Sequence, residues 1–521
     1  MARYRIAPPA VSCGVGMLAC ACVTLHCVEV SAQVADQPYA DMLAPRLQSA
    51  TRNPPRFQKF DRPAPTELAA LETFTLASGV GKTGFNSTNN RKKKSKSKLK
   101  SLAYAQVLGA YVTDAVVFGA PGAPPVQIGP IRKKPKAHGE PDDPYAPLGI
   151  HVGSFNLFPA VELIGGYDSN PGHEPGGPAA ALFTVAPELR AQSNWSRHEV
   201  KVDLRGSYNW YIPDETPGLS RPYVNGKVDG RIDVAGDMRV DVSGRVLIST
   251  DNPGSPNLQA GLAKLPIYVV GGGTIGLGER FNRFDLSIKG DIERTVYQQS
   301  TLTDGSTASN DDRNYDQYGG VLRGGYEASP GLAPFAEIAV DTRVHDLSTD
   351  FSGYQRNSNG VRGMVGAKFE LTRLITGEAA LGYTQRVYED PRLPNISAPV
   401  GSASLLYDVD ALTKVKLIAA SVVGESTIPG VSGVLYRDIG LQIDHSFRYW
   451  LVGTLKLGFG VDDYVGSDRI DNRYTVAVGL TYKLNRCAQV RGEFRQNWLR
   501  STVTGVDYNE SVFLLGLRFQ R

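Results

Sequence analysis

The stretch RYTVAVGLTYK, from Arg473 to Lys483, alternates between two kinds of side chain. One set of alternate positions is tyrosine, valine or leucine, and the other is arginine, lysine, threonine or a small residue. Successive side chains of a β-strand point to opposite faces of the sheet. The stretch therefore predicts a strand of a two-sided sheet, with one apolar and one polar face.

The same alternation continues from about residue 154 to the end of the chain, and residues 197–210 and 489–498 show it clearly. It predicts eighteen strands, with sixteen as the alternative, and connections that are alternately short and long. Short connections are expected at 235–237 and 329–331, and long ones at 251–264 and 299–312. A transmembrane barrel has short periplasmic turns, long extracellular loops and usually an even number of strands. We therefore expect an all-β fold, a transmembrane antiparallel up-and-down β-barrel over residues 151–521; a soluble sandwich would not alternate its loop lengths in this way.

The composition agrees with a β-rich membrane protein. Among the 521 residues, 56 are glycine and 24 are tyrosine, and the formal net charge of +4 is too small to indicate a nucleic-acid partner. No segment after the N-terminal leader has 18 or more residues without polar groups, which argues against a helical membrane bundle.

The first 32 residues read as a secretory signal peptide, with arginines at 3 and 5, an apolar region and the cleavage-site pattern Val30-Ser31-Ala32. A lipoprotein signal ending at Cys20 and an N-terminal anchor helix are the alternatives. Four of the five cysteines lie in this leader, so only Cys487 stays in the mature chain and an intramolecular disulfide is excluded.

Residues 33–150 have proline clusters, little periodicity and two basic blocks, Arg91 to Lys100 and Arg132 to Lys136. Blocks of like charge repel and stay extended. We expect a low-complexity periplasmic tether, either a solvated linker or an arm whose block from Arg91 to Lys100 contacts a polyanion, a partner or lipid headgroups.

Two glycine motifs resemble nucleotide-binding loops, and neither has the context that this function needs. Residues 79–83 (GVGKT) lack the first glycine of a P-loop and a following helix. Residues 271–276 (GGGTIG) precede a segment with a period of two, whereas a dinucleotide site needs a helix there. The sequence offers no catalytic residue, cofactor site or metal site, and we expect a protein that is not an enzyme.

Two further segments point to the outer membrane. The last strand ends in alternate apolar residues from Phe513 to Phe519, which resembles the signal read by the barrel-assembly machinery, although Gln520 and Arg521 follow it. The opening G-S-F-x-L-x-P-x-x-E-x-x-x-G-Y-D-x-N-P, from Gly153 to Pro171, resembles the putative β-barrel porin 2 family. The resemblance implies an outer-membrane barrel of Gram-negative bacteria, embedded in outer-membrane lipid. Many members occur beside capsule or exopolysaccharide genes.

A barrel of sixteen to eighteen strands encloses an aqueous channel. The polar faces of the expected strands supply charges of both signs as pore-lining candidates, namely Lys201, Asp203, Arg205, Lys289, Asp291, Arg491, Glu493 and Arg495. They either set a field across the lumen that orients polar solutes, or pair along the wall. We expect a porin-like pore for small polar solutes; an exopolysaccharide export conduit or accessory barrel, a plugged structural barrel and a barrel enzyme are the alternatives.

Overall fold

The computed structural model describes residues 144–521, except residues 215–216, 235–237 and 372–373. Four expected features lie outside the described residues: the signal peptide, most of the tether with both basic blocks, the P-loop-like motif at 79–83 and the short connection at 235–237.

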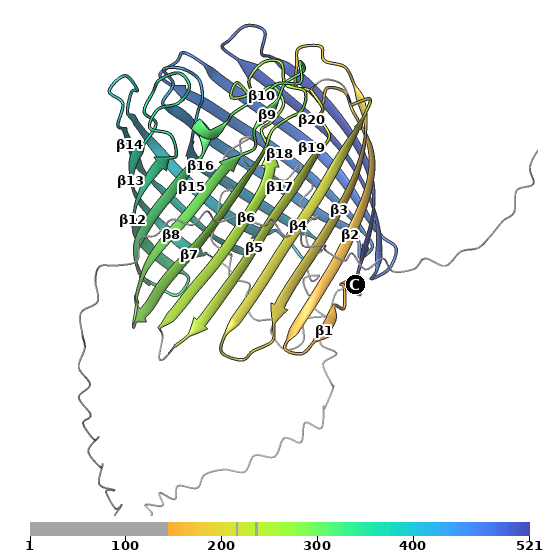
Figure 1. The fold of residues 1–521 in the computed structure, drawn as a ribbon. Coiled ribbons are helices and arrows are strands. Elements are labelled where there is room, and N and C mark those ends of the chain that lie inside the picture. The colour runs from red at the N-terminus through yellow and green to blue at the C-terminus, as the bar shows by residue number, and fades with distance from the viewer. Residues whose placement is uncertain (1–143, 215–216, 235–237, 372–373) are drawn as a thin grey trace, which may run out of the picture. The chain divides into compact units, whose positions relative to one another are not determined.

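Nineteen antiparallel strands form one sheet, and eighteen of them, β2–β8 and β11–β21, close into a barrel because the last strand pairs with β2 (Figure 1). The additional strand, β1 (Ile150–Val152), pairs with the start of β2. The barrel strands are β2 (Phe155–Asp168), β3 (Ala180–Ser193), β4 (Glu199–Ile212), β5 (Arg221–Asp233), β6 (Arg239–Thr250), β7 (Ile267–Phe281), β8 (Phe284–Tyr297), β11 (Tyr315–Tyr326), β12 (Leu332–His345), β13 (Ser358–Glu370), β14 (Ile375–Tyr388), β15 (Ile396–Asp408), β16 (Thr413–Gly424), β17 (Gly433–Arg448), β18 (Leu451–Val465), β19 (Ile470–Lys483), β20 (Ala488–Ser501) and β21 (Tyr508–Gln520).

The prediction of an eighteen-stranded up-and-down barrel is confirmed, and the strand ends differ from expectation by a few residues. The strand β7 continues to Phe281, three residues beyond the expected end at 278. The turn that follows has only two residues, and the first, Asn282, has φ 54°. Asparagine adopts this left-handed conformation more readily than most residues, and two-residue hairpin turns require it. The GGGTIG motif lies inside β7, so these glycines belong to a strand.

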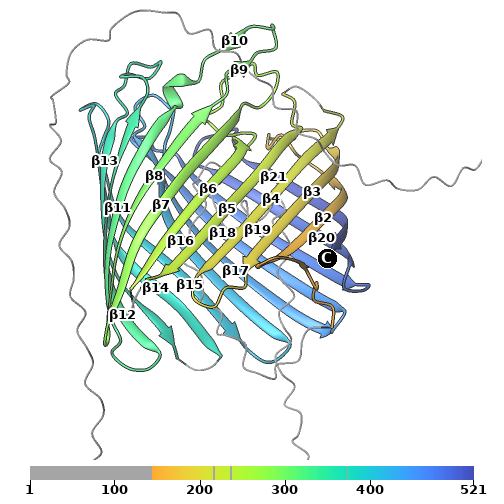
Figure 2. The same ribbon diagram turned by 60° about the horizontal axis from the view of Figure 1, so that its bottom comes forward.

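Short and long connections occupy opposite ends of the barrel (Figures 1 and 2). The long end includes a small hairpin, β9 (Ser300–Thr301) with β10 (Thr307–Ala308), and a 3-10 helix, η1 (Asp311–Arg313). The C-terminus and β1 lie at the end with the short turns (Figure 1). In outer-membrane barrels this end faces the periplasm and the long loops face outward.

The outer wall is apolar, as a lipid-facing surface requires. Side chains such as Leu381, Val365 and Leu515 are more than half exposed there. Aromatic residues gather near the strand ends on this face, with Tyr208 beside Trp210 at one end and Trp450 beside Tyr482 at the other. Such bands mark the two membrane–water interfaces. Among the described residues, no helix is long and apolar enough to cross a membrane.

Candidate functional site

The eight pore-lining candidates lie on the polar faces of β4, β8 and β20, opposite the apolar side chains that face lipid. On β4, Lys201, Asp203 and Arg205 share a face with the buried Ser207 and Asn209, while the apolar neighbours face lipid. The candidates on β8 and β20 follow the same rule. Their contribution to conduction stays a prediction.

Most of the candidates form ion pairs along the wall. Lys201 Nζ lies 2.7 Å from the Glu199 carboxylate, and Arg205 Nε lies 2.7 Å from Asp203. Glu493 contacts Lys456 at 3.4 Å and Arg495 at 3.9 Å. The two pairs on β4 each join residues two positions apart on the same strand, so opposite charges lie next to each other on the inner wall.

The two candidates on β8 present their charge more openly. Lys289 is exposed to the lumen, and Asp291 is half-buried beside β11. Gly319 of β11 makes room for this carboxylate, because an added Cβ would lie 2.6 Å from its oxygens. These two side chains are therefore the clearest positions at which to alter the charge that a solute meets.

A buried charge network joins the first and last strands where the barrel closes. Glu162 of β2 accepts a hydrogen bond from Arg491 of β20 at 2.9 Å and lies 3.8 Å from Arg518 of β21. Arg518 also contacts Glu188 of β3 at 2.7 Å, and Glu188 contacts Arg190 at 2.8 Å. Sequence analysis found Arg491 but missed its partners. Their position on the polar face of predicted strands was the available signal, but only the closure of the barrel brings residues 162 and 518 together.

Two loops from nearly opposite sides of the barrel meet over the lumen. The Oδ1 atom of Asn257, in loop 251–266, accepts hydrogen bonds from the backbone N–H and the hydroxyl group of Thr427, at 3.1 and 3.2 Å. Eight strands separate the two loops in one direction around the ring and ten in the other. Loop 251–266 and loop 425–432 therefore narrow the outer mouth of the pore.

Loop 251–266 is held in place by backbone hydrogen bonds on both sides. Gly218 of loop 213–220 donates to Ala263 O at 2.8 Å, and the Ala263 N–H donates to Thr301 O at 2.8 Å. On the same side, Thr303 donates to Gly261 O at 2.9 Å. The loop is thus built into the mouth as an ordered element rather than as a solvated connection.

Buried arginine–carboxylate pairs anchor the mouth loops to one another and to the wall. Arg313 contacts Asp251 at 2.7 Å, and Arg343 contacts Glu425 at 2.5 Å. Arg356 contacts Asp350 at 2.6 Å and also donates to two backbone carbonyls of loop 425–432. Together with three tyrosines these groups line a cavity of about 50 Å³.

Glu425 shows that the anchors are ionic. Burial raises the pKa of a carboxyl group, yet the charges of Arg343, His345 and Arg386, with Arg343 foremost, together more than offset it, so the pKa of Glu425 lies below its ordinary value. The carboxylate is therefore ionised at neutral pH and forms a charge-assisted bond with Arg343, which is stronger than a neutral hydrogen bond.

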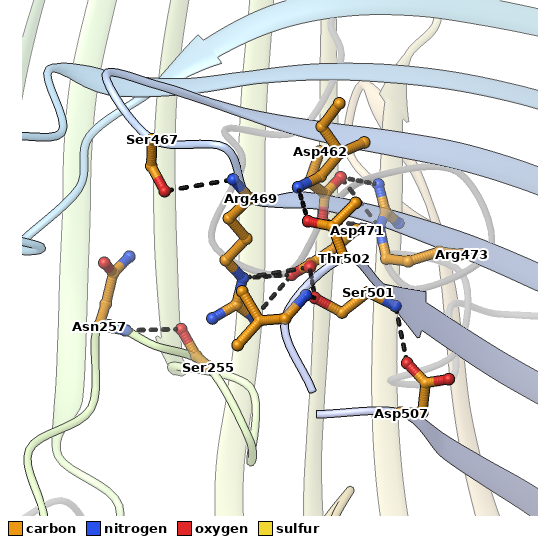
Figure 3. Close-up of polar contacts among 12 residues, drawn as sticks. Ser255, Asn257, Asp462, Ser467, Arg469, Asp471, Arg473, Ser501, Thr502 and Asp507 are labelled. Carbon is orange, nitrogen blue, oxygen red and sulfur yellow. Dashed lines mark hydrogen bonds and ion pairs between the residues drawn. The ribbon is translucent and has the colours of Figure 1, made fainter. Parts of the chain in front are cut away.

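A second polar cluster fixes the outer ends of β18, β19 and β20 (Figure 3). Arg473 contacts both Asp462 and Asp438 at 2.7 Å, and Arg469 contacts Asp471 at 2.7 Å. The Ser501 hydroxyl group donates to Asp471 at 2.6 Å. These ion pairs and hydrogen bonds join neighbouring strands and hold this part of the rim in place. Within the described part of the chain, no three His, Cys, Asp or Glu side chains converge on a possible metal position.

One protein family matches the whole barrel of this chain. Residues 143–521 match the family described as "Putative beta-barrel porin 2". The chain belongs to this family. As a member, this porin 2 barrel is an outer-membrane protein with a porin-like pore for small solutes, and the resemblance seen in the opening from Gly153 to Pro171 is confirmed.

Several solved structures are similar to the porin 2 barrel. The outer membrane protein OpdK from Pseudomonas aeruginosa is 11% identical, with a TM-score of 0.38, and the match covers 70% of this chain and 99% of that one. A BenF-like porin from Pseudomonas fluorescens Pf-5 is 11% identical, with a TM-score of 0.37 and coverage of 70% and 99%. OccAB2 from Acinetobacter baumannii is 12% identical, with a TM-score of 0.36 and coverage of 71% and 98%. No curated protein matches the chain.

Proposed function

We propose that the pore passes small polar solutes of either charge sign with little discrimination, through a mouth narrowed by ordered loops. The observation that carries this proposal is the inner wall of the closed eighteen-stranded ring, where acidic and basic side chains alternate in pairs. A wall whose charges are compensated locally hydrates a channel without giving it a large net potential. Pairing along the wall therefore favours weak selectivity over a strong field across the lumen.

The experiment is single-channel recording of the mature chain in planar bilayers, with a salt gradient to measure the reversal potential. We expect ohmic steps and a reversal potential near zero. Lys289→Gln should shift selectivity toward cations and Asp291→Asn should shift it toward anions, because each removes one lumen charge of known sign. The two variants control for each other, since a merely structural disturbance has no reason to act in opposite directions.

Two outcomes would contradict the proposal. A barrel that is folded, as shown by heat-modifiable migration in gels, but carries no current would favour a plugged structural barrel. A strongly selective wild-type pore would show that the paired wall charges do not cancel.

For the N-terminal region we propose a periplasmic tether. The first described residues support this position: the Arg486 Nε atom in the β19–β20 turn donates to Pro144 O at 2.7 Å, at the end where the C-terminus lies. The basic block from Arg91 to Lys100 would then face periplasmic polyanions, a partner protein or inner-leaflet headgroups. Deleting residues 33–142 should leave the unit conductance unchanged if the segment is only a tether, and a larger conductance after deletion would show that it obstructs the lumen. We propose that the barrel-assembly machinery reads the last strand, β21, so deletion of residues 33–142 should leave assembly of the barrel unaffected.

A further inference from the structure

His173 lies where two mouth loops meet the barrel wall. It belongs to loop 169–179, its side chain is almost completely buried, and its backbone has φ 54°. Left-handed backbone is uncommon for residues other than glycine. The position is therefore set by the surroundings of the residue and not by its own preference.

The imidazole ring is fixed on one side by β21. It stacks on the Tyr508 ring with a centroid separation of 4.7 Å and an interplanar angle of 2°. Its Nε2 atom lies 3.3 Å from Glu510 Oε1. The second oxygen of Glu510 accepts a hydrogen bond from Asn497 at 2.6 Å, so the carboxylate cannot turn away from the ring without losing that bond.

On its other side the ring meets loop 251–266. His173 Nδ1 lies 3.1 Å from the carbonyl oxygen of Pro253 and 3.0 Å from the Asn252 side-chain amide nitrogen. The two loops are in close contact here, because a Cβ added to Gly254 would lie 2.8 Å from the carbonyl oxygen of His173. The same loop reaches across the lumen to Thr427.

Both ring nitrogens thus face an oxygen that can only accept a hydrogen bond, the Glu510 carboxylate and the Pro253 carbonyl. Only the imidazolium form has a proton on each nitrogen. A neutral ring that keeps its Nε2 proton still donates to Glu510 and can accept from Asn252. It loses the hydrogen bond to the Pro253 backbone and the charge that pairs with Glu510.

We propose that His173 is a positioning residue that holds loop 251–266 in the mouth of the pore, more firmly when the imidazole is protonated. In acidic solution the loop then stays docked, the pore is narrow and current fluctuations are rare. In mildly alkaline solution the loop is released. The inference rests on the proposed pore function only for its electrical readout, since the docking of the loop is a property of the folded barrel.

Other titratable groups surround the ring and must be distinguished from it. Glu510 and Tyr508 come from β21, Asp168 from β2 and Glu174 from the same loop, and Arg495 of β20 interacts with Glu510. Loop 251–266 itself contributes Asp251, which is paired with Arg313. Histidine is the side chain whose ordinary titration falls between pH 5 and 8. The carboxyl pair of Asp168 and Glu510 is the competing explanation for any pH effect in this range.

The first test records single channels of the full mature chain at pH 5.5 and pH 8.0. We expect the ratio of released to docked dwell times to rise roughly ten-fold at pH 8.0, the change that loss of one hydrogen bond to a charged group produces. His173→Asn suits the left-handed backbone and should show released behaviour at both pH values. His445→Asn, on the outer wall, and Asp168→Asn should keep the wild-type pH dependence. A pH dependence that persists in His173→Asn, or that disappears in Asp168→Asn, would overturn the proposal.

The second test does not need conduction. A spin label at Gln259→Cys, in a Cys487→Ser background, reports the mobility of the loop tip in liposomes. The label should be more mobile at pH 8.0 than at pH 5.5, and mobile at both values when His173→Asn is added. A label whose mobility is the same at both pH values in the unmodified loop would show that protonation does not control docking, whether or not the barrel conducts.

Discussion

Removing the negative charge of Glu162 should weaken the closure of the barrel. Glu162 is only 2% exposed, and its carboxylate lies 2.9 Å from Arg491 and 3.8 Å from Arg518. In Glu162→Gln the Arg491 guanidinium loses its only carboxylate ion-pair partner among the described residues, while Arg518 keeps Glu188 at 2.7 Å. Breaking a buried ion pair from one side costs about 3–5 kcal/mol. Because Arg518 keeps its ion pair with Glu188, we expect a loss at the lower end of this range, about 3 kcal/mol of unfolding free energy.

The assay is reversible urea unfolding of the barrel in liposomes, followed by tryptophan fluorescence and by heat-modifiable migration. The matched control is Glu199→Gln, which breaks the exposed pair with Lys201 on the same lumen face. Exposed pairs contribute about 0–1 kcal/mol. If the two variants lose the same small amount of unfolding free energy, then the network at the closure does not stabilise the barrel. A double variant, Glu162→Gln with Arg491→Gln, should recover part of the loss because it leaves no unpaired charge at that position.

Three further predictions concern the mouth and the outer wall. A disulfide between Asn257→Cys and Thr427→Cys should lock the two loops together, and current fluctuations should decrease in oxidised channels and return after reduction. The pKa of Glu425 lies below its ordinary value of 4.5, so its anchor contributes stability above about pH 4.5 and loses it as the pH falls through the lower folded-state pKa. Thermal melting should show a larger loss of stability below pH 4.5 in the wild type than in Glu425→Gln, in which the Asp251 and Asp350 anchors remain. Leu381→Arg places a charge on the lipid face and should cost about 2–4 kcal/mol in liposomes, whereas an unchanged unfolding free energy would show that this position does not face lipid.

Local alternation was sufficient to predict most of the architecture. The period of two in RYTVAVGLTYK and its counterparts sets which side chains face lipid and which face the lumen, and this depends on the geometry of a single strand. The alternating loop lengths then indicate the number and direction of the strands. For the same reason Lys201, Asp203 and Arg205 could be placed on the lumen face from sequence alone.

Contacts between distant segments were beyond this reasoning. The pairing of Glu162 with Arg518 depends on which strands become neighbours when the sheet closes. The meeting of Asn257 with Thr427 depends on the width of the lumen, and the fit of His173 between Glu510 and Pro253 depends on how two loops fold inward. The amino-acid sequence was enough to predict a two-sided wall of sixteen or eighteen strands, because alternation is a local property of the chain. The closure of that wall and the narrowing of its mouth depend on the three-dimensional fold, because those contacts join residues 80 or more positions apart that no periodic pattern relates.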